Sequence, residues 1–189
     1  MGAYILEQIH LKRKAGKSGD LLSVMALAKE DGKYMSDDEL VAFAGQIFVA
    51  GNETTTSLIS NLVWRLLTID DLWNEFCREE IDVDDAINES FRFDPPLLGL
   101  FKTTSRDVFV DGVTIPSNTK VMMHYGAANR DPLAFSEPNT FKLKRSGKKM
   151  LSFSVGLHVC IGRELAKLEA RVTLMALRQR YPKLRLVNE

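Results

Sequence analysis

The feature that most restricts the fold is one long helical pattern in the first half of the sequence. Ser36 is followed three residues later by Glu39, and this spacing predicts a capping box at a helix N-terminus. Apolar residues then recur at helical spacing from Leu40 to about Leu67. A helix of that length spans roughly 40 Å, which exceeds most helices of globular proteins. Because residues 40–50 are apolar on nearly every side, we expect that part of the helix to be buried.

The other patterns predict a helix-rich chain with a small β element. Further helices are expected at residues 4–14, 21–30, 72–78, 84–91 and 163–180. Residues 100–125 alternate in polarity and contain the turn "VDGVTIP", which predicts short strands. Residues 129–149 are rich in Pro, Asn, Ser, Gly and Lys, which predicts a long ordered loop. We find no internal repeat, and we expect residues 1–189 to form a single domain.

Composition narrows the classes of function. The hydrophobic content of 45% and the charged content of 26% are those of an ordinary soluble protein. Lys plus Arg equal Asp plus Glu at 25 each, and this balance argues against a nucleic-acid partner bound by bulk charge. Cys77 and Cys160 are far apart, so neither a disulfide framework nor a zinc motif is predicted. With no export signal and no apolar run of membrane-spanning length, we expect a cytoplasmic protein without membrane attachment.

The stretch "FSVGLHVCIG", residues 153–162, carries the first candidate for chemistry. A lone cysteine is usually a buried structural residue, and this alternative stays open for Cys160. Against it, Gly156 and Gly162 bracket the cysteine and permit a tight loop that another group can approach closely. A helix is expected to begin just beyond Cys160, and its N-terminal amides would favour a thiolate. Because the spacing is wrong for zinc, a single thiolate suits a metal that a porphyrin already holds.

The stretch "AGNETTTS", residues 50–57, departs from the local rules of helix formation. Gly51 and three consecutive threonines weaken the middle of the long helix, and such departures often mark function. Glu53 could relay protons, and the hydroxyl of Thr54 could hold a ligand or water. The alternative is a packing kink in which threonine hydroxyls bond to carbonyls one turn earlier.

The stretch "ESFR", residues 89–92, places a carboxylate and a guanidinium three residues apart. On a helix, Glu89 and Arg92 would therefore lie within reach of an ion pair. Taken alone, the tetrapeptide favours the alternative, a solvated surface pair that contributes little to stability.

Together and in this order, these stretches resemble the cytochrome P-450 family of heme-thiolate monooxygenases, of the bacterial soluble type. "FSVGLHVCIG" fits the FxxGxHxCxG heme-binding loop, "AGNETT" resembles the oxygen-activating motif AGx(D/E)T, and "ESFR" matches ExxR. "FDPP", "ANRDP" and "FSEPNTFKLKR" also resemble segments of the family. The resemblance implies a mainly α fold, namely the C-terminal helical part of the P-450 fold with a small β element and a cysteine heme-ligand loop. Family members are about twice this length, so we expect their N-terminal half to be missing.

The resemblance implies heme b (iron protoporphyrin IX) as cofactor, with Cys160 as the axial thiolate ligand of the iron. It also implies that His158 bonds a heme propionate and that Phe153 packs near the ligand loop. Other residues expected against the heme are Gly156, Gly162, Ala50, Gly51 and Lys102. Lys102 stands where the family pattern leads us to expect an arginine, and lysine keeps the charge but loses the bidentate fork.

The resemblance further implies catalytic, structural and substrate-facing residues. Glu53 and Thr54 would lie over the distal face of the heme and deliver protons to dioxygen. Glu89, Arg92 and Arg145 would form a structural charge network. Residues expected to approach the substrate are Leu98, Gly99 and Leu100.

The function implied is heme-dependent monooxygenation, in which dioxygen is activated and a small apolar organic substrate is hydroxylated. A ferredoxin- or flavodoxin-like electron donor would dock on a basic set around the cysteine loop, although a solvated loop and helix face would have the same composition. The basic set comprises Lys142, Lys144, Arg145, Lys148, Lys149, Arg163, Lys167 and Arg171.

Two alternatives to the monooxygenase remain at this point. One is a peroxygenase, isomerase or dehydratase on the same scaffold. The other is a truncated, non-catalytic fragment that binds heme loosely or not at all. In the second case, exposed Phe43, Phe48 and Leu62 would seek a missing half or a second copy in a homo-oligomer.

Overall fold

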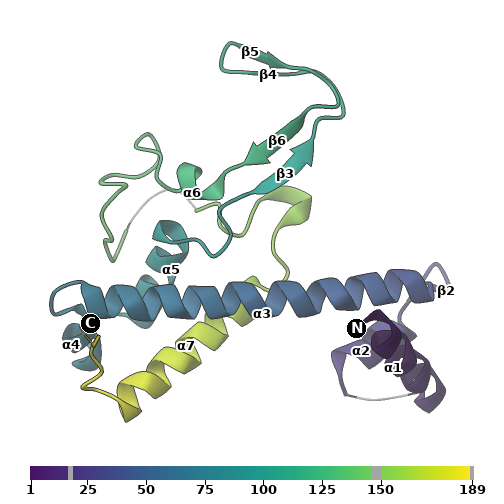
Figure 1. The fold of residues 1–189 in the computed structure, drawn as a ribbon, viewed down its shortest axis with the longest axis horizontal. Helices are drawn as coiled ribbons and strands as arrows, with labels where there is room; N and C mark the ends of the chain where they lie inside the picture. Colours follow the sequence, from purple (N-terminus) through teal and green to yellow (C-terminus); the bar gives the residue numbers. More distant parts are fainter. Residues whose placement is uncertain (17–18, 146–149, 188–189) are drawn as a thin grey trace. The chain divides into compact units, whose positions relative to one another are not determined.

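The computed structural model describes residues 1–16, 19–145 and 150–187. The chain divides into two compact units, Met1–Glu53 and Thr54–Glu189, which are described separately. Helix α3, Asp37–Thr68, contributes residues to both units and continues without interruption through the stretch at 50–57 (Figure 1). Across the described residues, no helix is both long and apolar enough to cross a membrane.

The first unit consists of α1 (Gly2–Ala15), α2 (Leu21–Leu27), a two-stranded hairpin and the first turns of α3. The hairpin pairs β1 (Lys29–Glu30) with β2 (Lys33–Tyr34) in antiparallel register. Asp31 and Gly32 form its turn with positive φ angles, a backbone conformation that Asp and Gly tolerate well. This hairpin was not predicted, because its strands are short and polar rather than alternating. The helix expected at residues 21–30 ends at Leu27, and Lys29–Glu30 form a strand instead.

The predicted capping box is confirmed at the start of α3. The Ser36 amide donates to Oε2 of Glu39 at 2.8 Å, and the Glu39 amide donates to Oγ of Ser36 at 3.3 Å. These two bonds satisfy backbone donors that a helix N-terminus otherwise leaves without partners. The predicted helix start is therefore correct to within one turn.

The prediction that residues 40–50 are buried is wrong for much of that stretch. The core of the first unit contains Ile9, Met25, Ala26 and Leu40, so one side of α3 is covered. Phe43, Phe48 and Val49 lie on other sides of the helix and are exposed. Two short helices and a hairpin are enough to cover one stripe of a helix, but not its whole circumference.

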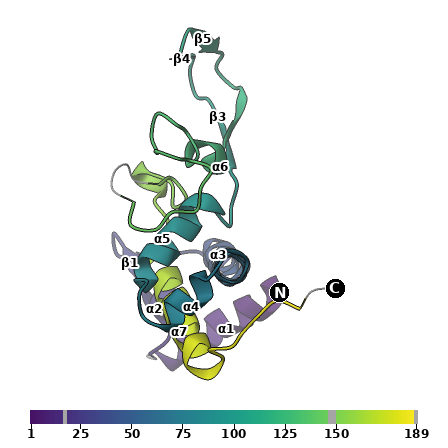
Figure 2. The same ribbon diagram turned by 90° about the vertical axis from the view of Figure 1, so that its left-hand side faces the viewer.

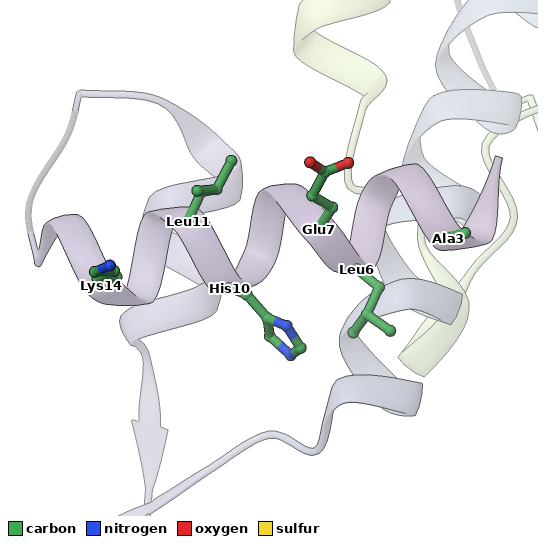
Figure 3. A pocket seen from close by; sticks show the side chains of 6 residues that line it. All are labelled: Ala3, Leu6, Glu7, His10, Leu11 and Lys14. Carbon is green, nitrogen blue, oxygen red and sulfur yellow. The ribbon is translucent and has the colours of Figure 1, made fainter.

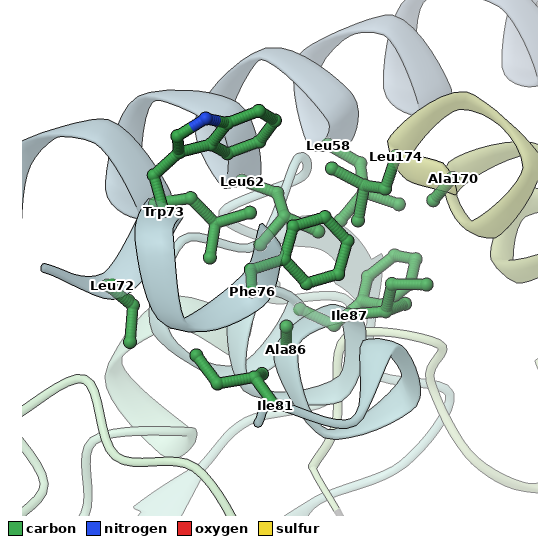
Figure 4. Close-up of a cluster of buried hydrophobic side chains, with 12 residues drawn as sticks. Leu58, Leu62, Leu72, Trp73, Phe76, Ile81, Ala86, Ile87, Ala170 and Leu174 are labelled. Carbon is green, nitrogen blue, oxygen red and sulfur yellow. The ribbon is translucent and has the colours of Figure 1, made fainter. Parts of the chain in front are cut away.

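The second unit contains the rest of α3, α4 (Leu72–Cys77), α5 (Val83–Phe93), α6 (Tyr125–Ala128) and α7 (Arg163–Arg180). Its core gathers side chains from α3, α4, α5 and α7 (Figure 4). Leu58, Leu62 and Leu66 recur every four residues and place one stripe of α3 in this core. Leu62 is fully buried, so the expectation that it would be exposed is wrong.

The predicted strands at 100–125 form two antiparallel pairs. β3 (Leu100–Thr103) pairs with β6 (Lys120–Met123), and β4 (Val108–Val110) pairs with β5 (Val113–Ile115). Asp111 and Gly112 connect β4 to β5 with positive φ angles, as the "DG" in the sequence predicts. Both pairs extend from the end of the unit that carries α6 (Figure 2).

The last predicted helix is confirmed with the bounds given by the sequence, Arg163–Arg180. Helix α7 packs against α5. The cysteine loop precedes α7 and the "ESFR" stretch lies on α5, so both belong to the second unit. Ahead of α7, residues 151–162 form the loop, which includes a single 3-10 turn at Gly156–His158.

Candidate functional site

The "ESFR" stretch lies on α5 and forms a buried ion pair. Nε of Arg92 donates to Oε2 of Glu89 at 2.8 Å, and Nη2 donates to Oε1 at 2.7 Å. The two side chains are only 4% and 3% exposed for Glu89 and Arg92, respectively. The two parallel bonds match the planar fork of a guanidinium to a carboxylate. The solvated surface pair that the isolated tetrapeptide favours is therefore wrong.

Arg145 reaches the same carboxylate from a segment more than fifty residues away. Its Nε donates to Oε1 of Glu89 at 2.9 Å and to Oε2 at 3.1 Å. The backbone amide of Lys142 also donates to Oε1 at 2.8 Å. The structure thus brings Glu89, Arg92 and Arg145 together, as the resemblance implies.

The two guanidinium groups use their remaining donors on backbone carbonyls of the irregular segment 129–140. Arg92 donates to the carbonyls of Asn129, Pro138 and Thr140 at 2.9–3.0 Å. Arg145 donates to the carbonyls of Ser136, Glu137 and Thr140. A segment without helix or strand otherwise has no regular partners for its carbonyls, so this cluster is what fixes its course beside α5.

The cysteine loop begins inside the core and ends outside it. The ring of Phe153 packs on that of Phe91 with 4.3 Å between ring centroids. The Cys160 amide donates to the carbonyl of Phe153 at 2.9 Å, which closes the loop. Gly156 has a φ angle of +70°, a region that strongly favours glycine, and Gly162 caps the N-terminus of α7.

The outer part of the loop is exposed. Cys160 and His158 are both exposed, so the alternative of a buried structural cysteine does not hold for Cys160. Its apolar neighbours Val155, Leu157 and Ile161 are exposed as well. A run of exposed apolar side chains beside a thiol indicates a surface that an apolar group can cover.

The other residues predicted to lie near the heme fall on two elements, α3 and β3. Ala50, Gly51 and Glu53 lie exposed on α3 in the first unit, whereas Thr54 is half-buried in the second. Lys102 is exposed on β3.

The predicted substrate-facing stretch leads into β3. Leu98 and Leu100 are exposed, and Gly99 lies between them. A Cβ on Gly99 would lie 2.6 Å from the carbonyl oxygen of Met123 on the paired strand. Only glycine therefore fits at this position without a shift of the backbone.

Carboxylates of this chain pair with four of the six described members of the predicted basic set. Four described members are ion-paired, namely Lys142 with Glu137, Arg145 with Glu89, Arg163 with Glu164 and Arg171 with Asp84. Lys144 is exposed, and Lys167 is half-buried with its ammonium 5.9 Å from the ring centroid of Phe153. Lys148 and Lys149 lie outside the described residues. A surface of paired charges attracts an acidic partner less strongly than the sequence count predicts.

A hollow on α1 contains none of the predicted site residues. It is lined by Ala3, Leu6, Glu7, His10, Leu11 and Lys14 (Figure 3). All six side chains come from one helix, so the hollow is an open surface feature rather than an enclosing pocket.

Sequence reasoning missed two groups of polar residues. One is the pair Asn129 and Ser152, which joins α5 to the cysteine loop. The other holds α1 against the start of α3 and consists of His10, Arg13 and Asp37. The bonds within each group join residues more than twenty positions apart in sequence, so no local pattern could have indicated them.

Comparison with known proteins gives one consistent result. The family model described as Cytochrome P450 matches residues 3–183. Cytochrome P450 109 of Bacillus spizizenii is 37% identical over 88% of this chain and 41% of that protein. Vitamin D(3) 25-hydroxylase of Pseudonocardia autotrophica is 36% identical over 97% of this chain and 46% of that protein. The crystal structure of CYP109E1 from Bacillus megaterium with corticosterone superposes with a TM-score of 0.92 at 33% identity, covering 100% of this chain and 50% of that one.

The chain belongs to the cytochrome P450 family. It has the mainly α fold of that family, as predicted. It spans about half the length of the curated relatives it matches.

The family implies a heme group, and the residues around Cys160 fit one. Among the residues that the structure describes, no three or more His, Cys, Asp and Glu gather where they could hold a metal ion. The exposed Cys160 offers a single thiolate ligand, and a porphyrin would supply the other ligands of its iron. The exposed apolar Val155, Leu157 and Ile161 offer a surface for a flat apolar ring.

Proposed function

We propose that the protein carries the cysteine-ligand part of a heme-dependent monooxygenase that hydroxylates a small apolar substrate. The observation that carries the proposal is the loop at 153–162, which is anchored by Phe153 and presents the thiol of Cys160 at its surface. A thiolate-ligated heme, when bound, supplies the chemistry that activates dioxygen. The name of one relative, a vitamin D(3) 25-hydroxylase, supports a hydroxylation.

In this proposal each residue has a separate task. Cys160 would be the thiolate ligand of the heme iron, and the glycines at 156 and 162 would let the loop lie close to the heme. His158 and Lys102 would hold its propionates. Glu53 moves protons toward the site of oxygen chemistry, and the hydroxyl of Thr54 holds the last proton donor in place.

The substrate and the electron donor belong to the proposal as well. Leu98 and Leu100 would contact the substrate through apolar side chains, and the close approach at Gly99 keeps their backbone fixed. Electrons would come from a ferredoxin- or flavodoxin-like protein. Because four of the six described members of the basic set are ion-paired, we expect this docking to depend only modestly on salt.

The proposal is tested by adding heme to the purified chain, reducing it, adding carbon monoxide and recording the absorption spectrum. We expect the strongly red-shifted Soret band of a thiolate-ligated heme in the wild-type protein and in Cys77→Ala. We expect Cys160→Ala to lose that band. Failure of the wild-type chain to take up heme would overturn the proposal for this chain and favour the non-catalytic fragment.

A second measurement distinguishes the monooxygenase from a peroxygenase or an isomerase on the same scaffold. A monooxygenase consumes dioxygen only when a reductant is supplied, whereas a peroxygenase works with hydrogen peroxide alone and an isomerase needs neither. We expect Glu53→Gln and Thr54→Val to slow oxygen consumption that is coupled to product, by about 10²-fold or more. Product formed without any oxidant would contradict this part of the proposal.

A further inference from the structure

Asn129 stands between the charge cluster on α5 and the cysteine loop. It is fully buried, and its carbonyl accepts from Nη1 of Arg92 at 2.9 Å. Its side chain faces the start of the loop, where Oδ1 accepts from the Leu151 amide at 2.7 Å and Nδ2 donates to Oγ of Ser152 at 2.7 Å. One residue therefore bonds the cluster through its backbone and the loop through its side chain.

The polarity of these bonds makes the amide specific. Ser152 accepts from Asn129 and donates its own proton to the carbonyl of Phe91 on α5. A carboxylate at position 129 could still accept from Leu151, but its second oxygen would also require a proton from Ser152. The serine has only one proton to donate, so its bond to Phe91 would be lost.

The chain of contacts continues from Ser152 to the thiol-bearing residue. Phe153 packs on Phe91, and its carbonyl accepts the amide of Cys160 at 2.9 Å. The exposed Cys160 thus depends for its position on a buried anchor that begins at Asn129. Groups that orient a metal ligand in this way typically change metal affinity when they are altered.

We propose that Asn129 is a positioning residue for Cys160. Through its hydrogen bond to Ser152, which acts as the relay, Asn129 fixes the position and orientation of the loop and therefore of the Cys160 sulfur. The consequence for heme rests on the proposed function, whereas the consequence for the geometry of the loop does not. Asn129 lies within "ANRDP", a stretch that the proposed function leaves without a chemical role.

The first test compares Asn129→Asp, Ser152→Ala and the double variant with the wild-type protein. We expect each single variant to weaken heme binding by about 10- to 100-fold and to shift the carbon monoxide spectrum away from the thiolate form. The double variant should resemble Ser152→Ala alone, because both changes break the same relay. Additive losses in the double variant would overturn the relay.

Trp73→Phe is the matched control for a loss of stability alone. It removes one buried side-chain bond, from Nε1 of Trp73 to the carbonyl of Pro182 at 3.0 Å, in the same unit but on α4. We expect it to leave the ratio of thiolate to other heme forms unchanged. An equal spectral shift in Trp73→Phe and Asn129→Asp would show a general structural effect and would overturn the proposal.

The second test requires no heme. In a Cys77→Ala background, Cys160 is the only cysteine, and its alkylation rate by iodoacetamide reports the setting of the loop. We expect Asn129→Asp and Ser152→Ala to change this rate several-fold, and Trp73→Phe to leave it unchanged. If the wild-type protein binds no heme, the proposed function fails, and the alkylation rate of Cys160 alone decides whether Asn129 is a positioning residue. An unchanged alkylation rate in both loop variants would overturn the positioning role.

Discussion

Each unit contains one cluster in which a carboxylate accepts from two basic side chains, and the two clusters differ in burial. In the second unit, the carboxylate of Glu89 accepts from Arg92 and Arg145 and is 4% exposed. In the first unit, the carboxylate of Asp37 accepts from His10 at 2.7 Å and from Arg13, and it is 38% exposed. Each cluster also binds backbone carbonyls of neighbouring segments. The difference in solvent exposure should therefore decide how much each contributes.

Burial has little effect on the net strength of an ion pair, but it strongly raises the free-energy penalty when one partner is removed. A buried carboxylate that loses its guanidinium cannot be solvated, so the penalty is large. An exposed carboxylate that loses its partner is hydrated at once, so the penalty is small. The comparison teaches that the segment 129–145, beside the cysteine loop, depends on its cluster far more than the first unit depends on Asp37.

The largest effect is expected for Arg92→Ala. It leaves Glu89 short of one partner and removes the donor for the carbonyls of Asn129, Pro138 and Thr140. We expect the free energy of unfolding of the second unit to fall by about 3–5 kcal/mol. Both tryptophans lie in this unit, so denaturant unfolding followed by their fluorescence measures it.

Arg92→Lys is the control for charge. Lysine keeps the positive charge but cannot make the two parallel bonds to Glu89 or serve three carbonyls at once. We expect it to recover less than half of the loss. A variant Arg92→Ala within about 1 kcal/mol of the wild-type protein would show that the cluster behaves as a surface pair.

A smaller effect is expected for Arg13→Ala in the first unit. Besides Asp37, Arg13 donates to the carbonyls of Ala26 at 3.2 Å and Met35 at 2.7 Å, which ties α1 to the end of α2 and to the segment before α3. Losing these two bonds should lower the opening free energy of the unit by about 1–2 kcal/mol. Peptide-resolved hydrogen exchange over residues 1–16 and 19–53 measures it.

The control for this change is Lys12→Ala, which alters another residue of α1 and removes its ion pair with Asp20, the N-cap of α2. An exposed ion pair of this kind contributes little to stability, so we expect a change close to zero. If Arg13→Ala destabilises the first unit nearly as much as Arg92→Ala destabilises the second, burial is not the controlling factor. In that case the comparison between the clusters fails.

The sequence predicted most of the elements because their signals are local. The capping box at Ser36, the "DG" turn between β4 and β5, and the bounds of α7 all depend on residues a few positions apart. Apart from the unpredicted β1–β2 hairpin, the errors concern which side of a helix is covered. Phe43 and Phe48 are exposed while Leu62 is buried, and this outcome depends on elements that arrive later in the chain.

The residues of the candidate site likewise fall into those that a local motif indicates and those that no local motif indicates. The cysteine, its glycines and the "ESFR" spacing are visible as short motifs, and the resemblance supplied Arg145 as a third member. Asn129 and Ser152 carry no such signal, since asparagine and serine are ordinary loop residues. The ion pairs of the basic set could not be predicted from local sequence either, because Arg171, for example, pairs with Asp84 from a different helix.

The smallest effect, and the finest test of the comparison, is the pH dependence of the first unit. Hydrogen bonding from His10, and then from Arg13, lowers the pKa of Asp37 below its ordinary value of 3.8. A carboxyl with a lowered pKa in the folded state stabilises that state above its unfolded pKa, and the stabilisation is lost as pH falls through the folded pKa. We therefore expect the opening free energy of residues 1–53 to decrease below about pH 4. Asp37→Asn should remove this part of the decrease, measured by hydrogen exchange corrected for intrinsic rates.

The pKa of Glu39 is lowered as well, by the Ser36 amide and hydroxyl, so Asp37→Asn must leave a residual slope. Glu39→Gln removes that residue's share, and the double variant should have the flattest pH profile of the three.

Ionic strength provides the last test of the comparison, since salt screens an exposed cluster and does not screen a buried one. Raising ionic strength should flatten the acid-induced loss in the first unit while leaving the effect of Arg92→Ala in the second unit unchanged. Equal salt sensitivity in both units would mean that solvent reaches Glu89 as freely as it reaches Asp37.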